Sequence, residues 1–193
     1  TGTMTGRRAR TVHRRLDDGL PLRVRPLRAA DLAQAEQFFE GMSEQSRYMR
    51  FMAPMPRLTE SALKLVEETL QEERSLTLVA TADVEGEERI IGGVRIVPTD
   101  RVDTCEFSAV VLDRWQGRGL GTLLLHEVER HAKRLGYREL EGIILADNSR
   151  MLAAARHNRY RLAPHALDAT IVVAQRNLSS PPLRRRRSRP APR

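Results

Sequence analysis

The stretch of residues 106–121 reads Glu-Phe-Ser-Ala-Val-Val-Leu-Asp-Arg-Trp-Gln-Gly-Arg-Gly-Leu-Gly. Its first half is apolar enough for a buried strand, expected over residues 104–112. Its glycines permit a tight turn, and an amphipathic helix is expected over residues 119–135. The unpaired N–H groups and the dipole at a helix N-terminus bind anions. The stretch therefore predicts a strand, a glycine turn and a helix that together bind a pyrophosphate.

Alternating and helical hydrophobic patterns surround this stretch. They predict one strand, three helices, three strands, a helix, a strand, a helix and two strands. The strands are expected over residues 22–27, 75–82, 89–97, 104–112, 139–145, 160–162 and 169–175; the other helices are expected at 31–39, 43–50, from 59, and at 149–157. We expect one domain at 21–178, a disordered basic segment at 1–20 and a disordered Pro/Arg-rich tail at 179–193.

The positive charge of the chain lies mainly at its two ends. The 193 residues carry a formal net charge of +8, and residues 1–15 and 179–193 hold five and six arginines without any acid. Without these eleven charges, residues 16–178 carry −3, which would suit a cationic amine substrate better than nucleic acid. The sequence has no stretch apolar enough to span a membrane and no signal peptide, so we expect a soluble, cytoplasmic protein.

The strand, the Gln-x-x-Gly-x-Gly turn and the helix together resemble the GNAT (Gcn5-related) N-acetyltransferase superfamily over about residues 22–175. The resemblance implies an α/β (α+β) GNAT fold, with a mixed central sheet of six to seven strands flanked by helices. It also implies acetyl-CoA as co-substrate, with its pantetheine arm in a splay between the fourth and fifth strands. Val110 and Leu112 would then offer backbone bonds to the pantetheine. The cofactor-binding residues implied are Val110, Val111, Leu112, Gln116, Gly117, Arg118, Gly119, Leu120, Gly121, Thr122 and Asn148.

Within the superfamily the chain resembles the acetyltransferase domain of bacterial Pat-type protein lysine acetyltransferases. The segments that carry this likeness are residues 47–51 after Ser43, residues 106–111, and residues 148–152. The chain departs from the pattern at Arg159-Tyr160, where the family has Gly-Phe. Ala155 stands where many small-molecule GNAT enzymes have a tyrosine, so the group that protonates the departing thiolate is unassigned.

Transfer to an amine requires a base, because an alkylamine with a pKa near 10.4 is neutral in only about one molecule in 2,500 at pH 7. Glu106 is the candidate, since a strand carboxylate that leads into the cofactor turn would be partly desolvated and its pKa raised. The alternative is that Glu106 has only a structural role, as a strand glutamate paired with an arginine. No metal site is expected: Cys105 is the single cysteine, and His126 and His131 lie five apart on one helix.

Four functions are compatible with the sequence. The first is direct acetyl transfer to a primary amine, in particular a protein lysine, and the second is transfer to a small-molecule amine. The third is a catalytically silent acetyl-CoA sensor, and the fourth is nucleic-acid binding through the basic tails. The expected partners are acetyl-CoA and the amine acceptor; no membrane is expected, nucleic acid is disfavoured, and a homodimer is left open.

Overall fold

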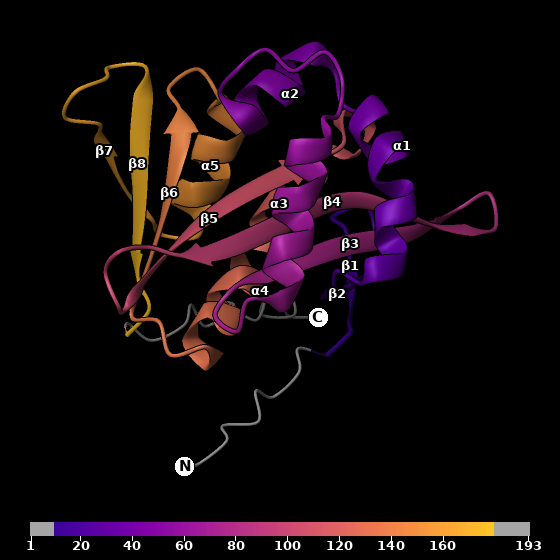
Figure 1. Cartoon of the computed structure of the whole chain (residues 1–193), viewed down its shortest axis with the longest axis horizontal. Coiled ribbons are helices and arrows are strands. Elements are labelled where there is room, and N and C mark those ends of the chain that lie inside the picture. Colours follow the sequence, from indigo (N-terminus) through magenta and orange to yellow (C-terminus); the bar gives the residue numbers. More distant parts are fainter. Residues whose placement is uncertain (1–9, 180–193) are drawn as a thin grey trace, which may run out of the picture.

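The strands of the computed structural model, which describes residues 10–179, form one open sheet in the order β1-β2-β3-β4-β5-β6-β8-β7 (Figure 1). The strands are β1 (Val12–Arg15), β2 (Pro21–Pro26), β3 (Leu76–Val84), β4 (Glu87–Pro98), β5 (Thr104–Val111), β6 (Glu139–Leu145), β7 (Arg161–Pro164) and β8 (Ile171–Asn177). The helices are α1 (Ala35–Glu40), α2 (Glu44–Phe51), α3 (Glu60–Gln71), α4 (Leu120–Arg134) and α5 (Ser149–His157), with 3₁₀ helices η1 (Ala29–Gln34) and η2 (Asp113–Trp115). Only β5 and β6 pair in parallel. The mixed sheet confirms the predicted fold class, with eight strands instead of six to seven.

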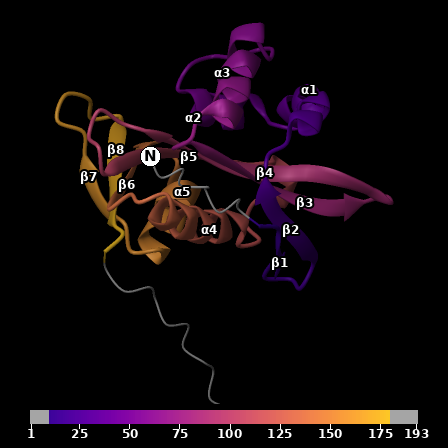
Figure 2. The ribbon, with the colours of Figure 1, turned by 60° about the horizontal axis from the view of Figure 1, so that its bottom comes forward.

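Helices cover both faces of the sheet. Figure 2 shows α1, α2 and α3 on one side and α4 and α5 on the other. The main core lies under α4, whose Leu120, Leu124, Leu125 and Val128 are at most 1% exposed. Each such side chain contributes about 1.5–3 kcal/mol when it is buried. Helix α4 is therefore held firmly against the sheet, and its N-terminus has a fixed position.

The strand β1 corrects the prediction that residues 1–20 are disordered. From Val12 onward the chain pairs with β2 as an antiparallel hairpin, whose turn contains Gly19 with φ +87°. Arg14 extends from β1 to α4 and donates a hydrogen bond of 2.8 Å to the fully buried carboxylate of Glu127. The arginine-rich composition concealed this strand, because long arginine side chains can cover apolar surface while their charged heads stay in water.

The N-terminal limit of the folded domain therefore moves from residue 21 to residue 12. At the other end, β8 is followed by the buried side chain of Leu178, close to the predicted limit. The predicted C-terminal tail lies outside the described residues except for Ser179.

The gap between β5 and β6 is the feature of the sheet that matters most for function. The two strands pair from Thr104 opposite Glu139 only as far as Phe107 opposite Gly142. Beyond this point β5 and β6 continue without pairing, and their arrows diverge in Figure 1. The ring of Phe107 lies over Gly142 so closely that a Cβ atom at that glycine would be 2.4 Å from two ring carbons. The predicted splay is thus confirmed, with an aromatic side chain at its apex.

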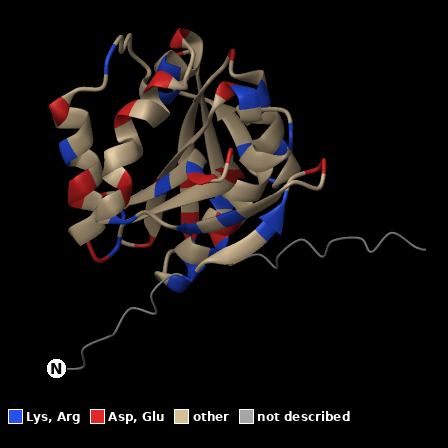
Figure 3. Ribbon diagram, turned by 90° about the vertical axis from the view of Figure 1, so that its right-hand side faces the viewer, with Lys and Arg blue, Asp and Glu red and all other residues tan. Residues whose placement is uncertain are grey.

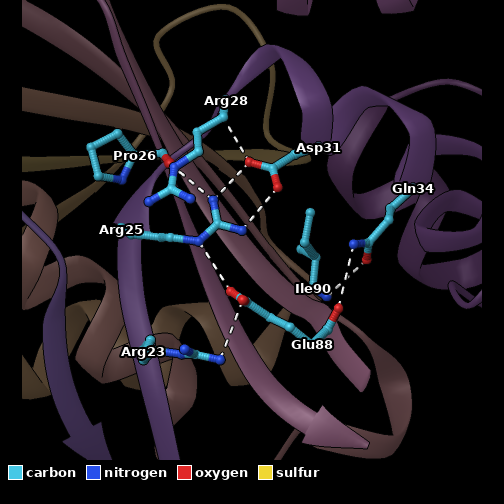
Figure 4. Close-up of polar contacts among 8 residues, drawn as sticks. All are labelled: Arg23, Arg25, Pro26, Arg28, Asp31, Gln34, Glu88 and Ile90. Atoms are coloured by element: carbon cyan, nitrogen blue, oxygen red, sulfur yellow. Dashed lines mark hydrogen bonds and ion pairs between the residues drawn. The ribbon is translucent and has the colours of Figure 1, made fainter. Parts of the chain in front are cut away.

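A buried ion pair attaches the α1 side of the molecule to the sheet (Figure 4). Arg25 of β2 donates to both carboxylate oxygens of Asp31, at 2.7 and 2.8 Å, and to Glu88 at 3.1 Å. Burial would raise the pKa of Asp31, but its hydrogen bonds to Arg25 and to the N–H of Arg28 hold it below its usual value. Removing one partner of a buried pair costs about 3–5 kcal/mol. The pair therefore fixes the start of η1, where the sequence places the first helix.

Charged residues are distributed over the described chain. In Figure 3, positions of Lys and Arg are interspersed with Asp and Glu along the ribbon, without the single basic stripe that marks many nucleic-acid-binding domains. None of the helices between residues 10 and 179 combines the length and the apolar character that crossing a membrane requires.

We predict that Gly142→Ala destabilises the fold by about 1–3 kcal/mol, because its Cβ overlaps the Phe107 ring. Urea denaturation measures the change. Phe107→Leu, which removes the ring, should relieve part of the penalty in the double variant. An additive effect of the two substitutions would mean that the ring does not set the spacing at the apex.

Candidate active site

The turn between β5 and α4 has the backbone conformation of an anion site. Gly117 and Gly119 both adopt left-handed conformations, with φ of +73° and +82°, which other residues reach only under strain. The N–H of Leu123 makes the first backbone bond of the helix, to Gly119 O at 3.0 Å. The N–H groups at positions 120–122 precede this bond, so they are free of helical partners and can bind phosphate oxygens.

A cleft with a volume of about 700 Å³ extends from this turn to α2 and α5. Its size falls within the range of about 300–1,000 Å³ that is typical of cofactor sites. Nine of the eleven predicted cofactor residues line it: Val110, Val111, Gln116, Gly117, Gly119, Leu120, Gly121, Thr122 and Asn148. The arrangement therefore offers a long molecule a path from an anion site into the gap between β5 and β6.

Arg118 and Leu112 do not line this cleft. The guanidinium of Arg118 donates to Asp18 at 2.6 Å and stacks 4.6 Å from the ring centroid of Trp115, so it braces the turn against the β1–β2 hairpin. The N–H of Leu112 donates to Ile91 O at 3.0 Å. This bond is directed into the sheet and is unavailable to a ligand.

The direction of that bond corrects the predicted backbone contacts. Backbone groups alternate in direction along an antiparallel strand, so those of Val110, like those of Leu112, face β4. The groups that face the gap belong to Val111 and Ala109, and both residues line the cleft. Ala109 was missed because the sequence does not reveal which side of β5 pairs with β4.

Gln116 connects three elements around the cleft. Its side-chain N–H groups donate to Val111 O at 2.9 Å and to Ser46 of α2 at 3.2 Å, and its oxygen accepts from Arg150 of α5. The side chain is thus occupied within the protein. Any contribution of Gln116 to phosphate binding would come from its backbone and from the shape it gives the turn.

Asp113 attaches α2 to the same turn. Its carboxylate accepts three hydrogen bonds of 2.8 Å, from the N–H and hydroxyl of Ser43 and from the hydroxyl of Ser46. Burial would raise the pKa of Asp113, but these bonds outweigh burial and lower it. Because Ser43 is also the N-cap of α2, the position of this helix depends on the turn that shapes the cleft.

Asn148 is the N-cap residue of α5. Its side-chain oxygen accepts from the N–H of Met151 at 3.1 Å. The residue also lines the cleft, and its amide N–H₂ group makes no hydrogen bond to another residue in the range 10–179. One end of the side chain thus fixes the helix while the other is free to donate to a ligand.

Glu106 lies half-buried on the face of the sheet covered by α2, two strand positions from Ser108 and opposite Val97 of β4. Burial raises the pKa of Glu106, and Glu141 on β6 raises it further, against Arg95 and Arg50, which act to lower it. The net shift is upward, as the sequence predicts. Glu106 does not line the large cleft. Arg50 does line it, and Arg50 is close enough to act on the pKa of Glu106.

A second, smaller cavity of about 160 Å³ lies between the sheet and the helices α1–α3. Its walls are mostly apolar, and Arg95 and Ser108 contribute polar groups. Arg50 and Val110 line both cavities, so the two meet at these residues. The cleft and this apolar chamber are thus neighbours, as the binding of two substrates would require.

Comparison with known proteins identifies the family of this fold. A family model described as an Acetyltransferase (GNAT) domain matches residues 22–161, which is more than half of the chain.

The chain belongs to the GNAT acetyltransferase family.

Individual relatives agree with the family. Acetyltransferase PA5475 of Pseudomonas aeruginosa is 29% identical over 136 residues, covering 70% of this GNAT chain and 73% of the relative. The GNAT domain of S. lividans PAT superposes with a TM-score of 0.75 at 27% identity, covering 86% of this chain and 96% of that one. The fold also matches yncA from Salmonella typhimurium, a structure with its cofactor acetyl-CoA, with a TM-score of 0.63 at 17% identity and coverage of 81% and 94%.

The GNAT assignment makes this chain an acyltransferase with acetyl-CoA as co-substrate. The two left-handed glycines, the first turn of α4 and the backbone of β5 fit the phosphates and the amide groups of such a molecule. Among residues 10–179, no three His, Cys, Asp or Glu side chains are grouped so that they could hold a metal ion.

We predict that Gly121→Val weakens acetyl-CoA binding at least tenfold, as measured by calorimetry. A Cβ at Gly121 meets nothing closer than Ala154 Cβ at 3.9 Å, so the fold should tolerate the side chain, which would obstruct the approach of the phosphates. Gly119→Val is the contrasting variant, because its Cβ would lie 2.6 Å from the Asp17 carboxylate and should lower stability as well. Unchanged affinity of a folded Gly121→Val variant would exclude this turn from the cofactor site.

We also predict that Asp113→Asn loosens α2. The amide retains the size of the side chain but cannot accept all three hydrogen bonds from Ser43 and Ser46. Hydrogen exchange should become faster in residues 44–51 and stay unchanged in α4. Equal protection of α2 in both proteins would show that the helix is held by its apolar contacts alone.

Proposed function

We propose that this enzyme moves the acetyl group of acetyl-CoA directly to a primary amine, with Glu106 as the general base. The observation that carries the proposal is the position of a half-buried carboxylate of raised pKa beside the arginine at which the two cavities meet. A base with a pKa closer to neutrality transfers protons more effectively at physiological pH.

The proposed reaction proceeds without a covalent enzyme intermediate. Glu106 accepts a proton from the ammonium group, directly or through a water molecule, and the amine nitrogen attacks the thioester carbon. The new C–N bond forms, the C–S bond breaks, and coenzyme A leaves as the thiolate. The second proton that the nitrogen loses passes to this thiolate, directly or through water, and yields the thiol. The backbone N–H groups of Ala109 and Val111 face the gap and are suited to donate to the carbonyl oxygen in this step.

Cys105 is poorly suited to carry the acetyl group. Its thiol is fully buried, and burial raises the pKa of Cys105 to about 12. Since the thiolate is the nucleophile, little of it would be present at neutral pH. This chemistry favours direct transfer over a route through an acyl-cysteine.

For the acceptor, we propose a protein lysine. The likeness to the GNAT domain of S. lividans PAT supports this choice, as do the three segments in which the sequence resembles Pat-type enzymes. A small-molecule amine is the second candidate, and the small apolar chamber next to Arg50 favours it. A thiol-release assay with acetyl-CoA against cell-extract proteins, polyamines, aminoglycosides and amino acids distinguishes the two.

A catalytically silent sensor of acetyl-CoA is the remaining alternative. It would be favoured by a Glu106 that is fully exposed and remote from the splay. Instead, the residue is half-buried and one position before Phe107, which lies at the apex of the splay. Its surroundings therefore support an enzyme.

We predict that Glu106→Gln lowers turnover about a hundredfold or more and leaves acetyl-CoA affinity nearly unchanged. The base works in its ionised form, so the rate should rise with pH through the raised pKa of Glu106, above the ordinary carboxyl value of 4.5. This limb of the pH–rate profile should vanish in the Gln variant. Full activity of that variant across neutral pH would reject Glu106 as the base.

Glu141→Gln is the matched control. Glu141 raises the pKa of Glu106, so its neutral replacement should shift the same limb to lower pH and keep the base. A limb that does not move would indicate that it reports another group.

A further inference from the structure

Two arginines face the candidate base from different elements. Arg95 lies on β4 opposite Ser108 of β5, and Glu106 lies opposite Val97, so Arg95 and Glu106 project from the same face of the sheet. Arg50 comes from α2, which covers this face and contacts β5. Both guanidinium groups act to lower the pKa of Glu106, and both arginines line the apolar chamber.

These two guanidinium groups lack the partners that half-buried arginines usually have. Within residues 10–179, neither one donates a hydrogen bond or forms an ion pair shorter than 4.0 Å; Arg50 only stacks 5.0 Å from the Phe51 ring centroid. Arg25, by contrast, has a bidentate bond to Asp31. Burial, together with the charge of Arg95, lowers the pKa of Arg50 to about 10, which reflects the cost of an unpaired charge at this place.

The local charge is positive, whereas residues 12–178 together are nearly neutral. Arg50 and Arg95 face Glu106, while the nearby Glu141 is already paired with Arg101 at 2.5 Å. Among Arg50, Arg95 and Glu106, one positive charge is thus left without compensation. An acceptor with only an ammonium group would be repelled here, and one that also carries an anion would be attracted.

We propose that Arg50 and Arg95 form a subsite for a carboxylate that the acceptor carries close to its amine. The inference rests on the proposed function, because it places the amine at Glu106. The planar fork of a guanidinium matches the geometry of a carboxylate, and the apolar chamber provides room for the hydrocarbon part of the acceptor. This chemistry is met by a free amino acid and by a lysine beside an acidic residue or a C-terminus, and it disfavours polyamines.

Acceptors matched in pairs test the subsite. One arm uses end-blocked peptides in which a lysine stands beside Glu or beside Gln, and the other uses apolar amino acids and their amides, compared over a range of pH. In at least one arm the carboxylate member should have a kcat/KM about ten- to a hundredfold higher, since hydrogen bonds to charged groups have this strength. The arm that responds identifies the source of the carboxylate.

Variants assign the effect to the two arginines. Arg50→Gln and Arg95→Gln should each reduce the preference for the carboxylate member to about one. Arg89→Gln, on the same strand but near the exposed β3–β4 turn, should retain it. A wild-type ratio near one in both arms, or a preference that survives both variants, overturns the proposal.

A binding measurement separates this proposal from the proposed function. The acetylated products of the carboxylate acceptors and those of the matched acceptors without a carboxylate are each titrated by calorimetry in the presence of coenzyme A. This measurement requires no turnover. Tighter binding of the charged member, lost in Arg95→Gln, supports the subsite even if every rate is low. If amines without a carboxylate are acetylated equally well, the acetyltransferase function stands and the subsite is rejected.

Discussion

The contact of Phe107 with Gly142 is the constraint on which the site depends. Parallel pairing of β5 and β6 stops at these residues, where the ring occupies the space in which a side chain on β6 would stand. Backbone groups beyond this point cannot be satisfied by the neighbouring strand. An unpaired backbone group in a protein interior is costly, so a ligand with amide groups of its own can complete the sheet.

The rest of the architecture aligns other groups with this gap. The apolar side of α4 holds its N-terminus beside the end of β5, and the glycine turn aims the N–H groups into the cleft. Asp113 and Gln116 connect the same turn to α2 and α5. Movement of the turn would therefore be transmitted to the helix that carries Arg50, which couples the two cavities mechanically.

The electrostatics of the site differ from those of the whole chain. The folded part has a small negative charge, whereas two guanidinium groups line the apolar chamber and act on the pKa of one carboxylate, Glu106. Charges interact strongly only over a few ångströms in the presence of salt. The identity of an acceptor is therefore decided by these few residues, and an average over the sequence is a poor guide to it.

The local elements and the glycine motif could be predicted from the sequence. The periodic pattern of α4 and the glycine turn could be recognised because hydrophobic spacing and backbone preference act over a few neighbouring residues. Strand β1, the backbone direction at Ala109 and Val111, and the meeting of Arg50 with Arg95 were decided by the tertiary structure. Each depends on which strands pair and in which register, and that is set by the packing of segments far apart in the chain.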